Sequence, residues 1–233
     1  MRIEILYSPG CLGLEETKSL IKETMLSLGI NGELLCINTD IDKRSYYKGS
    51  PTILVDGEDI DPLSPEKPNK DGCRIYENGN PYPPRYMIEA AILRALKPKK
   101  ILFMCVHNSV RSILAEGIAR HLAPADVEIL SAGSNPGGVK NDALKVLSEI
   151  GISTVGLYSK SVYDIDTKGV DCVITLCEEE ACPLFLGSAI KLHWGLKDPS
   201  TEPDLSKRLN AFRKTRDELY KRISLLFREK TIE

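Results

Sequence analysis

The chain has 233 residues, of which 42% are hydrophobic and 27% charged, an ordinary globular composition. Its 31 basic and 33 acidic residues leave a net charge of -2, so the charge balance gives no reason to expect nucleic acid as a partner. The opening MRIEILYSPG turns polar too early for a signal peptide, and no segment approaches the ~20 apolar residues of a membrane span, so we expect a soluble, cytoplasmic protein without a membrane partner.

Strands and helices alternate through the first 97 residues, which predicts an α/β unit. The expected elements are, in chain order, a strand at 2–8, a helix at 14–30 closed by Gly29, a strand at 32–38, a strand with a turn at Asp56-Gly57 over 50–60, a proline-rich loop at 61–71, a strand or hairpin arm at 73–79 and a helix at 84–96.

The segment KPKK at 97–100 interrupts this pattern, and a second α/β unit follows it. The expected elements are strands at 101–106, 127–134, 170–177 and 189–196, and helices at 111–123, 140–152 and 204–230. Strands separated by helices favour a parallel sheet. The sequence therefore predicts an α/β protein of two domains, 1–97 and 98–233.

The chain contains seven cysteines, an odd number. Structural disulfides are rare in the cytoplasm, where thiols stay reduced. The spacing shows no CxxC…CxxC or Cys/His cluster of the kind that binds zinc. We therefore expect no metal and no cofactor, and redox or nucleophilic thiol chemistry instead.

The stretch MCVHNSVRSILAEG at 104–117 has the order of an anion site. An apolar strand delivers Cys105 to its carboxyl end, and a helix begins at Arg111, so the amides of 106–110 and the helix dipole face the same point. Arg111 adds a planar fork suited to tetrahedral oxyanions, and the same field stabilises a thiolate at Cys105, to which Ser112 can donate. The predicted loop and its supports are Val106, His107, Asn108, Ser109, Val110 and Ser112.

This loop resembles the active-site loop of the low-molecular-weight tyrosine phosphatase fold. With His-Asn-Ser inside it, the loop is most similar to that of the thioredoxin-coupled arsenate reductases. The likeness continues in SAGS (131–134), VITLCEEEACP (173–183) and HWGLKDPS (193–200). It implies a parallel four-stranded sheet and makes Asp198 the general acid that protonates the leaving oxygen.

The need for additional cysteine thiols distinguishes arsenate reduction from phosphoester hydrolysis, the two activities found on this fold. Reducing arsenate to arsenite takes two electrons, and a cascade needs further thiols that each attack the previous sulfur. LCEEEACP supplies Cys177 and Cys182. By the resemblance, Cys105 forms the arsenic adduct, Cys177 attacks Cys105 and releases arsenite, and Cys182 attacks Cys177. The resulting disulfide would await a thioredoxin- or glutaredoxin-type donor. Fewer residues separate this pair than in the better-known members.

The first unit resembles thioredoxin- or glutaredoxin-like proteins in YSPGCLGLEETKSLI and GSPTILVDG, and Pro51 would be their cis-proline. The expected Cys-x-x-Cys reads CLGL, so Cys11 is present and Leu14 replaces its partner. Cys73 is the better candidate to resolve a mixed disulfide, while Cys36 and Cys172, each within a strand, are interpreted as core residues. Either this unit relays electrons to the second as a tethered reductant, with Cys11, Cys73 and Pro51 as its candidate relay, or it is a degenerate docking or dimerising domain.

Arsenate reductase is thus the function that the sequence predicts, with arsenate or a phosphate-like oxyanion as ligand. One alternative is a phosphohydrolase similar to the low-molecular-weight tyrosine phosphatases. Another is a thiol redox or metal-stress binding protein that uses its cysteines as a sink. Turnover of a phenyl phosphate without thiol oxidation would favour the first alternative, and stoichiometric metal capture the second.

Overall fold

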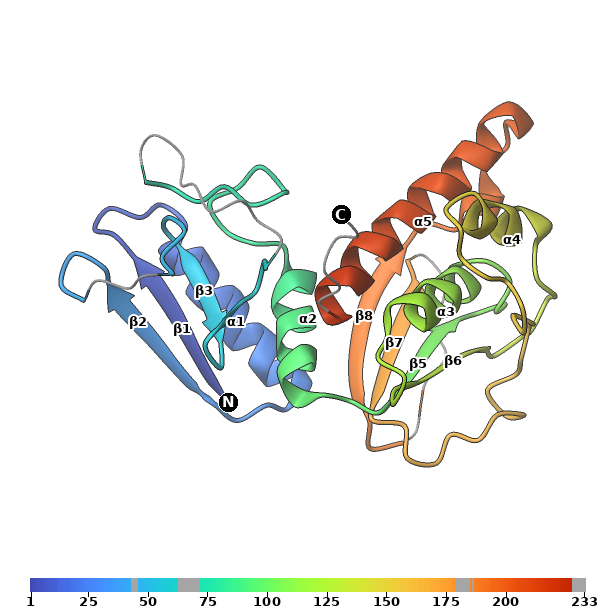
Figure 1. Ribbon diagram of the computed structural model, residues 1–233, viewed down its shortest axis with the longest axis horizontal. Helices are drawn as coiled ribbons and strands as arrows, with labels where there is room; N and C mark the ends of the chain where they lie inside the picture. The colour runs from blue at the N-terminus through green and yellow to red at the C-terminus, as the bar shows by residue number, and fades with distance from the viewer. Residues whose placement is uncertain (43–45, 63–71, 179–184, 186, 228–233) are drawn as a thin grey trace. The chain divides into compact units, whose positions relative to one another are not determined.

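The computed structural model describes residues 1–42, 46–62, 72–178, 185 and 187–227. It divides into two compact units, Met1–Lys97 and Pro98–Glu233, each with its own sheet (Figure 1). Cys182 and most of the predicted loop at 61–71 lie outside the described residues. Within the described part, no helix has the length and apolar character needed to cross a membrane.

The first unit is built around a mixed four-stranded sheet in the order β2-β1-β3-β4. Strand β1 runs parallel to β2 and antiparallel to β3, and β3 runs antiparallel to β4. The elements are β1 (Arg2–Tyr7), α1 (Leu14–Leu28), β2 (Glu33–Asn38), β3 (Thr52–Val55), β4 (Glu58–Asp59) and α2 (Arg85–Leu96). Helices α1 and α2 contact each other, and α2 is buried along most of its length.

Three local predictions for this unit are confirmed. Gly29 ends α1 in the left-handed conformation, with φ 64°, which glycine adopts without a steric penalty. Asp56 and Gly57, both with positive φ, form the turn that joins β3 to β4. The Ser50–Pro51 peptide bond is cis.

Two other predictions are wrong. Residues 73–79 form no strand: Cys73 makes a single β-bridge with Ser50, and the chain then turns, with the amide of Tyr76 donating to Asn80 O at 3.0 Å. Asn78 and Gly79, with Asn80 after them, favour that turn over an extended strand. Cys36 is exposed rather than in the core, because β2 is the edge strand and has a neighbour on one side only.

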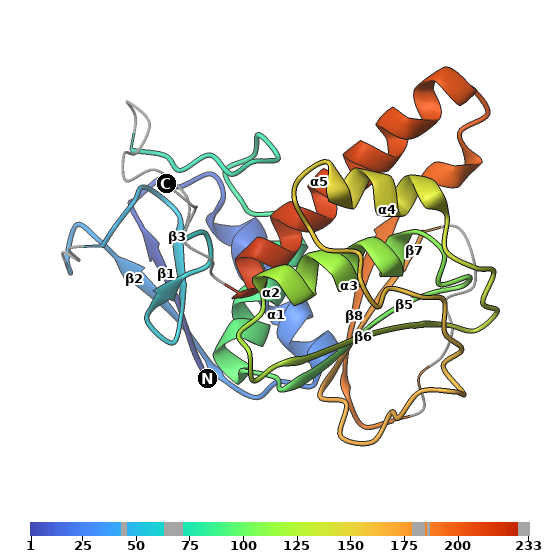
Figure 2. The same ribbon diagram turned by 45° about the vertical axis from the view of Figure 1, so that its right-hand side comes forward.

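The second unit contains a four-stranded sheet in the order β6-β5-β7-β8, with every neighbouring pair parallel, as predicted (Figure 2). The elements are β5 (Lys100–Cys105), α3 (Arg111–Leu122), β6 (Glu128–Gly133), α4 (Asn141–Ser148), β7 (Cys172–Cys177), β8 (Ile190–Leu196), the 3-10 helix η1 (Pro199–Thr201) and α5 (Leu205–Phe227). Helix α3 packs on β5 and β6, and α5 packs on α3 and α4. Cys172 and Trp194 are buried in the core, as expected for residues inside apolar strands.

Candidate active site

Cys105 is the last residue of β5, and α3 starts six residues later at Arg111. The side chain of Cys105 is buried, and its Sγ lies 3.0 Å from Ser112 Oγ, in the first turn of α3. Residues 106–110 therefore form a short loop between the carboxyl end of a central parallel strand and the amino end of a helix. Both the free backbone amides and the helix dipole at such a point favour a negative charge.

Asn108 holds this loop in an uncommon conformation. Its φ of 43° lies in the left-handed region, which a non-glycine residue keeps only when its surroundings impose it. The amide of Lys160 donates to Asn108 Oδ1 at 2.6 Å, and Asn108 Nδ2 donates to the hydroxyls of Ser112 and Ser131, both at 2.8 Å. The asparagine is fully buried and therefore determines the shape of the loop.

The outer half of the loop is held by the chain that follows β6. Ser109 Oγ donates to His107 O at 3.0 Å, and the His107 ring nitrogen Nδ1 lies 3.1 Å from Asn135 O. The amides of Asn135 and Gly137 donate to the carbonyls of Val106 and His107, both at 2.9 Å. The amide of Lys140 also donates to Ser109 O at 3.1 Å, so three carbonyls of the loop are bonded to the chain that follows β6.

Arg111 links the loop to the carboxyl ends of β7 and β8. Its Nη1 donates to Leu196 O at 3.0 Å and its Nη2 to Asp198 Oδ2 at 3.2 Å. The other oxygen of Asp198 accepts hydrogen bonds from the backbone amide and the hydroxyl of Ser200, at 2.9 and 2.7 Å. The guanidinium is almost completely buried, so its charge acts in a region of low dielectric at the carboxyl ends of β7 and β8.

Cys177 is the last residue of β7 and is also fully buried. Strands β5 and β7 are parallel neighbours, so Cys105 and Cys177 end at the same edge of the sheet. A register shift follows Thr175, after which Cys177 pairs with Leu196 of β8. The structure thus brings Cys105, Arg111, Asp198 and Cys177 to one edge, while Cys182 lies outside the described residues.

In the first unit, hydrogen bonds through Ser8 and Ser50 connect the backbone at Cys11 with the segment that contains Cys73. The amide of Cys11 donates to Ser8 O at 3.2 Å, and the amide of Ser8 donates to Ser50 Oγ at 3.0 Å. The residues on either side of Cys73 bond to the backbone of Ser50, through Ser50 N to Gly72 O at 2.8 Å and Arg74 N to Ser50 O at 2.9 Å. Pro51 follows directly, and the hydroxyl of Tyr76 donates to its carbonyl at 2.9 Å.

The structure also shows residues that the sequence did not single out. Glu116 of α3 is fully buried, and the ammonium of Lys160 lies 2.9 Å from its Oε2. The hydroxyl of Ser131 donates to the same carboxylate oxygen. A glutamate inside an otherwise apolar helix face does signal a buried partner, but neither the partner nor its position can be read from the pattern.

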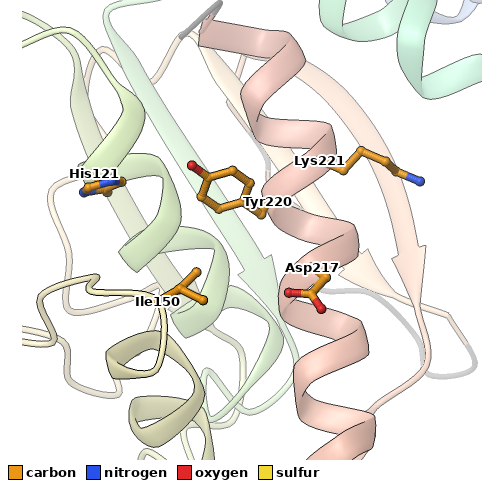
Figure 3. Close-up of a pocket in the computed structure, with 5 residues that line it drawn as sticks. All are labelled: His121, Ile150, Asp217, Tyr220 and Lys221. Carbon is orange, nitrogen blue, oxygen red and sulfur yellow. The ribbon is translucent and has the colours of Figure 1, made fainter. Parts of the chain in front are cut away.

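A cavity of about 320 Å³ lies at the other end of α3 (Figure 3). Its lining residues are His121, Ile150, Asp217, Tyr220 and Lys221. His121 belongs to the last turn of α3, whereas Arg111 begins that helix, so this cavity is separate from the Cys105 loop. Tyr220 and Asp217 point from α5 towards α3, and the ammonium of Lys221 points away (Figure 3).

Known proteins resemble the second unit. Residues 100–233, more than half of the chain, match the family described as low molecular weight phosphotyrosine protein phosphatase. The arsenate reductase of Shouchella clausii is 34% identical to this chain, over 55% of this chain and 94% of its own length. The arsenate reductase of Staphylococcus xylosus is also 34% identical, over 52% of this chain and 90% of its own length. A solved arsenate reductase in the phosphate binding state aligns at 30% identity and a TM-score of 0.48, over 56% of this chain and 97% of that one. The chain belongs to the low molecular weight phosphotyrosine protein phosphatase family.

Proposed function

We propose that this chain is an arsenate reductase, which converts arsenate to arsenite through Cys105 and an internal thiol-disulfide cascade. The observation that carries the proposal is the position of a second buried thiol, Cys177, at the same sheet edge as the Cys105 loop. An oxyanion site alone would serve a phosphatase equally well. A cysteine at the end of the neighbouring strand is what a two-electron reduction needs in addition.

The first step is nucleophilic attack on the bound oxyanion. The amides of residues 106–110 and the guanidinium of Arg111 bind arsenate and compensate its charge. The hydroxyl of Ser112, 3.0 Å from the sulfur, stabilises the Cys105 thiolate. The thiolate forms an S–As bond and one oxygen leaves as water, with Asp198 as the general acid that gives it a proton.

The next steps move two electrons. The thiolate of Cys177 attacks Cys105 Sγ, an S–S bond forms as the S–As bond breaks, and the electron pair of that bond stays on arsenic, which leaves as arsenite. The thiolate of Cys182 then attacks Cys177, and Cys105 returns to its thiolate form. The remaining disulfide between Cys177 and Cys182 is reduced by an external dithiol such as a thioredoxin or glutaredoxin.

The test is arsenite release from arsenate by the full chain, with thioredoxin and its reductase supplied. Wild type should turn over, whereas Cys105→Ser and Cys177→Ser should each release no more than background. Cys36→Ser is the matched control, because this cysteine is exposed and lies in the other unit. Failure of wild type to release arsenite under these conditions would contradict the proposal.

A phosphohydrolase is the second candidate, favoured by the family match over residues 100–233. Cys105, Arg111 and Asp198 would be sufficient for hydrolysis of a phosphoester, because that reaction transfers no electrons. Hydrolysis of an aryl phosphate that requires Cys105 but is unchanged in Cys177→Ser, in a protein that releases no arsenite, would establish this candidate in place of the reductase.

We also propose that the first unit is thioredoxin-like and acts as a tethered electron donor, in a reducing, cytoplasmic setting. Its order of elements, a parallel β-α-β unit followed by an antiparallel β-hairpin and a helix, supports this assignment. So does the position of Cys11, in the turn between β1 and α1. The two thiols of Cys11 and Cys73 would pass their electrons to the disulfide between Cys177 and Cys182 and become a disulfide themselves, which an external dithiol then reduces.

A further inference from the structure

A buried ion pair lies behind the Cys105 loop. The carboxylate of Glu116 is completely buried and the side chain of Lys160 nearly so. Lys160 Nζ donates to the two carboxylate oxygens at 3.2 and 2.9 Å and to Tyr158 O at 3.0 Å, and it lies 4.4 Å from the centre of the Tyr158 ring. Arg120 also pairs with Glu116. Charges removed from water in this way are tolerated only in a well-fixed geometry, so the carboxylate has a defined position.

A chain of hydrogen bonds leads from this carboxylate to the reactive sulfur. Because ionised Glu116 can only accept, the hydroxyl of Ser131 must use its hydrogen towards it, and its oxygen is then an acceptor for Asn108 Nδ2 at 2.8 Å. The same Nδ2 group donates to Ser112 Oγ at 2.8 Å. Ser112 is thereby left with its own hydrogen for Cys105 Sγ, 3.0 Å away.

The charge of Glu116 therefore fixes the donor direction at Ser131. The backbone amide of Lys160, which can only donate, holds Asn108 Oδ1 at 2.6 Å and so turns Nδ2 towards the two serines. Without this orientation, Asn108 would lose the bonds that hold its φ at 43° and the loop would lose its shape.

We infer that Glu116 and Lys160 are positioning residues of the Cys105 site, which set the donor direction of the Ser131–Asn108–Ser112 chain and so stabilise the Cys105 thiolate. Neither side chain belongs to the loop 106–110 that would bind the oxyanion. The inference rests on Cys105 being the reactive thiol of the proposed function, but not on arsenate being its substrate. Reaction of Cys105 with iodoacetate, measured on the full chain by mass spectrometry of its peptide, therefore tests it independently of arsenite release.

The experiment compares the pH dependence of Cys105 alkylation in wild type, Lys160→Met, Glu116→Gln, Asn108→Ala and the double variant Lys160→Met/Asn108→Ala. Each single variant should react about tenfold more slowly at neutral pH, the effect of one hydrogen bond to a charged group, with its profile displaced to higher pH. Since Lys160 acts through Asn108, the double variant should be no slower than Asn108→Ala alone. The other ionisable side chains at this edge of the sheet, His107, Arg111, Cys177 and Asp198, are unchanged in all of these variants.

Arg216→Met is the matched control for loss of a buried cation. Arg216 is buried, donates to Val146 O at 2.8 Å, and has no described bond to the Cys105 loop. This variant should lose stability but keep the wild-type alkylation profile. Ser131→Ala is a smaller change that leaves the ion pair intact, and it should shift the profile in the same direction as Lys160→Met. An unchanged profile in Ser131→Ala, or multiplicative losses in the double variant, would overturn the inference.

Discussion

The bond between Ser112 and the Cys105 sulfur is the most direct support that any single side chain gives to the thiolate. Ser112→Ala removes it without creating a large cavity, since both residues are small and buried. We expect arsenite release to fall about tenfold or more, because hydrogen bonds to charged groups contribute about 1.5–3 kcal/mol. Ser148→Ala, on the exposed end of α4, is the control. Equal activity of both variants would exclude this role for Ser112.

Asp198 is tested by a different substitution. Asp198→Asn keeps the side-chain oxygen that accepts from Ser200, but cannot give a proton to the leaving oxygen. We expect kcat to fall about 10²–10⁴-fold, the usual contribution of general acid catalysis, while alkylation of Cys105 persists. Asp204→Asn is the control, because this partly exposed aspartate accepts from Ser206 at the start of α5 and lies outside the Cys105 loop. An unchanged kcat in Asp198→Asn would assign the proton to another donor.

At the scale of residues, the sequence was informative where the site is local in the chain. Cys105, the loop and Arg111 are adjacent in sequence, so their arrangement follows from the order of strand, turn and helix. Lys160 and Glu116 are far apart in the chain and meet only through the fold. The wrong assignment of Cys36 has a similar cause, because an apolar run such as ELLCIN does not show whether its strand lies at the edge or the centre of the sheet.

At the scale of elements, the parallel sheet of the second unit could be predicted because each of its strands is an apolar run bounded by turns. The end of β6 shows what such patterns do not reveal. A Cβ on Gly133 would lie 2.5 Å from Val106 O and 2.8 Å from Asn108 N, so β6 and the loop can pack this closely only with glycine there. The sequence presents Gly133 as an ordinary turn residue and gives no sign of this contact.

Gly133→Ala should therefore displace the Cys105 loop while the rest of the unit stays folded. We expect arsenate turnover to be lost and protection of Cys105 from alkylation by phosphate to disappear, with an unchanged far-UV circular dichroism spectrum. Gly137→Ala is the matched control, because its Cβ would come within 3.2 Å of the movable side-chain oxygen of Ser109 and otherwise make ordinary van der Waals contact with the side chain of His107. Retention of phosphate protection in Gly133→Ala would show that the loop tolerates the displacement.

The ion pairs between the end of α4 and α5 predict how the stability of the fold depends on pH. Hydrogen bonds from Arg213, together with Arg216, hold the pKa of Glu149 below its ordinary value of 4.5. Ionised Glu149 therefore stabilises the folded state above about pH 4.5, and this contribution disappears as the pH falls through its lowered pKa. Wild type should melt at a higher temperature than Glu149→Gln at pH 7 in low salt, and the two should converge below about pH 4. A difference that stays constant with pH would contradict this reading.

At the scale of the whole molecule, the proposal for the first unit depends on tethering. A donor on the same chain has an effective concentration of about millimolar, which does not change when the enzyme is diluted. With a small dithiol as the final reductant, turnover per enzyme molecule should be independent of enzyme concentration in wild type. Cys11→Ser and Cys73→Ser should lose most of this turnover, yet keep the activity supported by external thioredoxin, because that donor reduces the second unit directly. Cys36→Ser again serves as control. If Cys11→Ser matches wild type with the small dithiol, the first unit is not the donor, and a docking or dimerising role takes precedence.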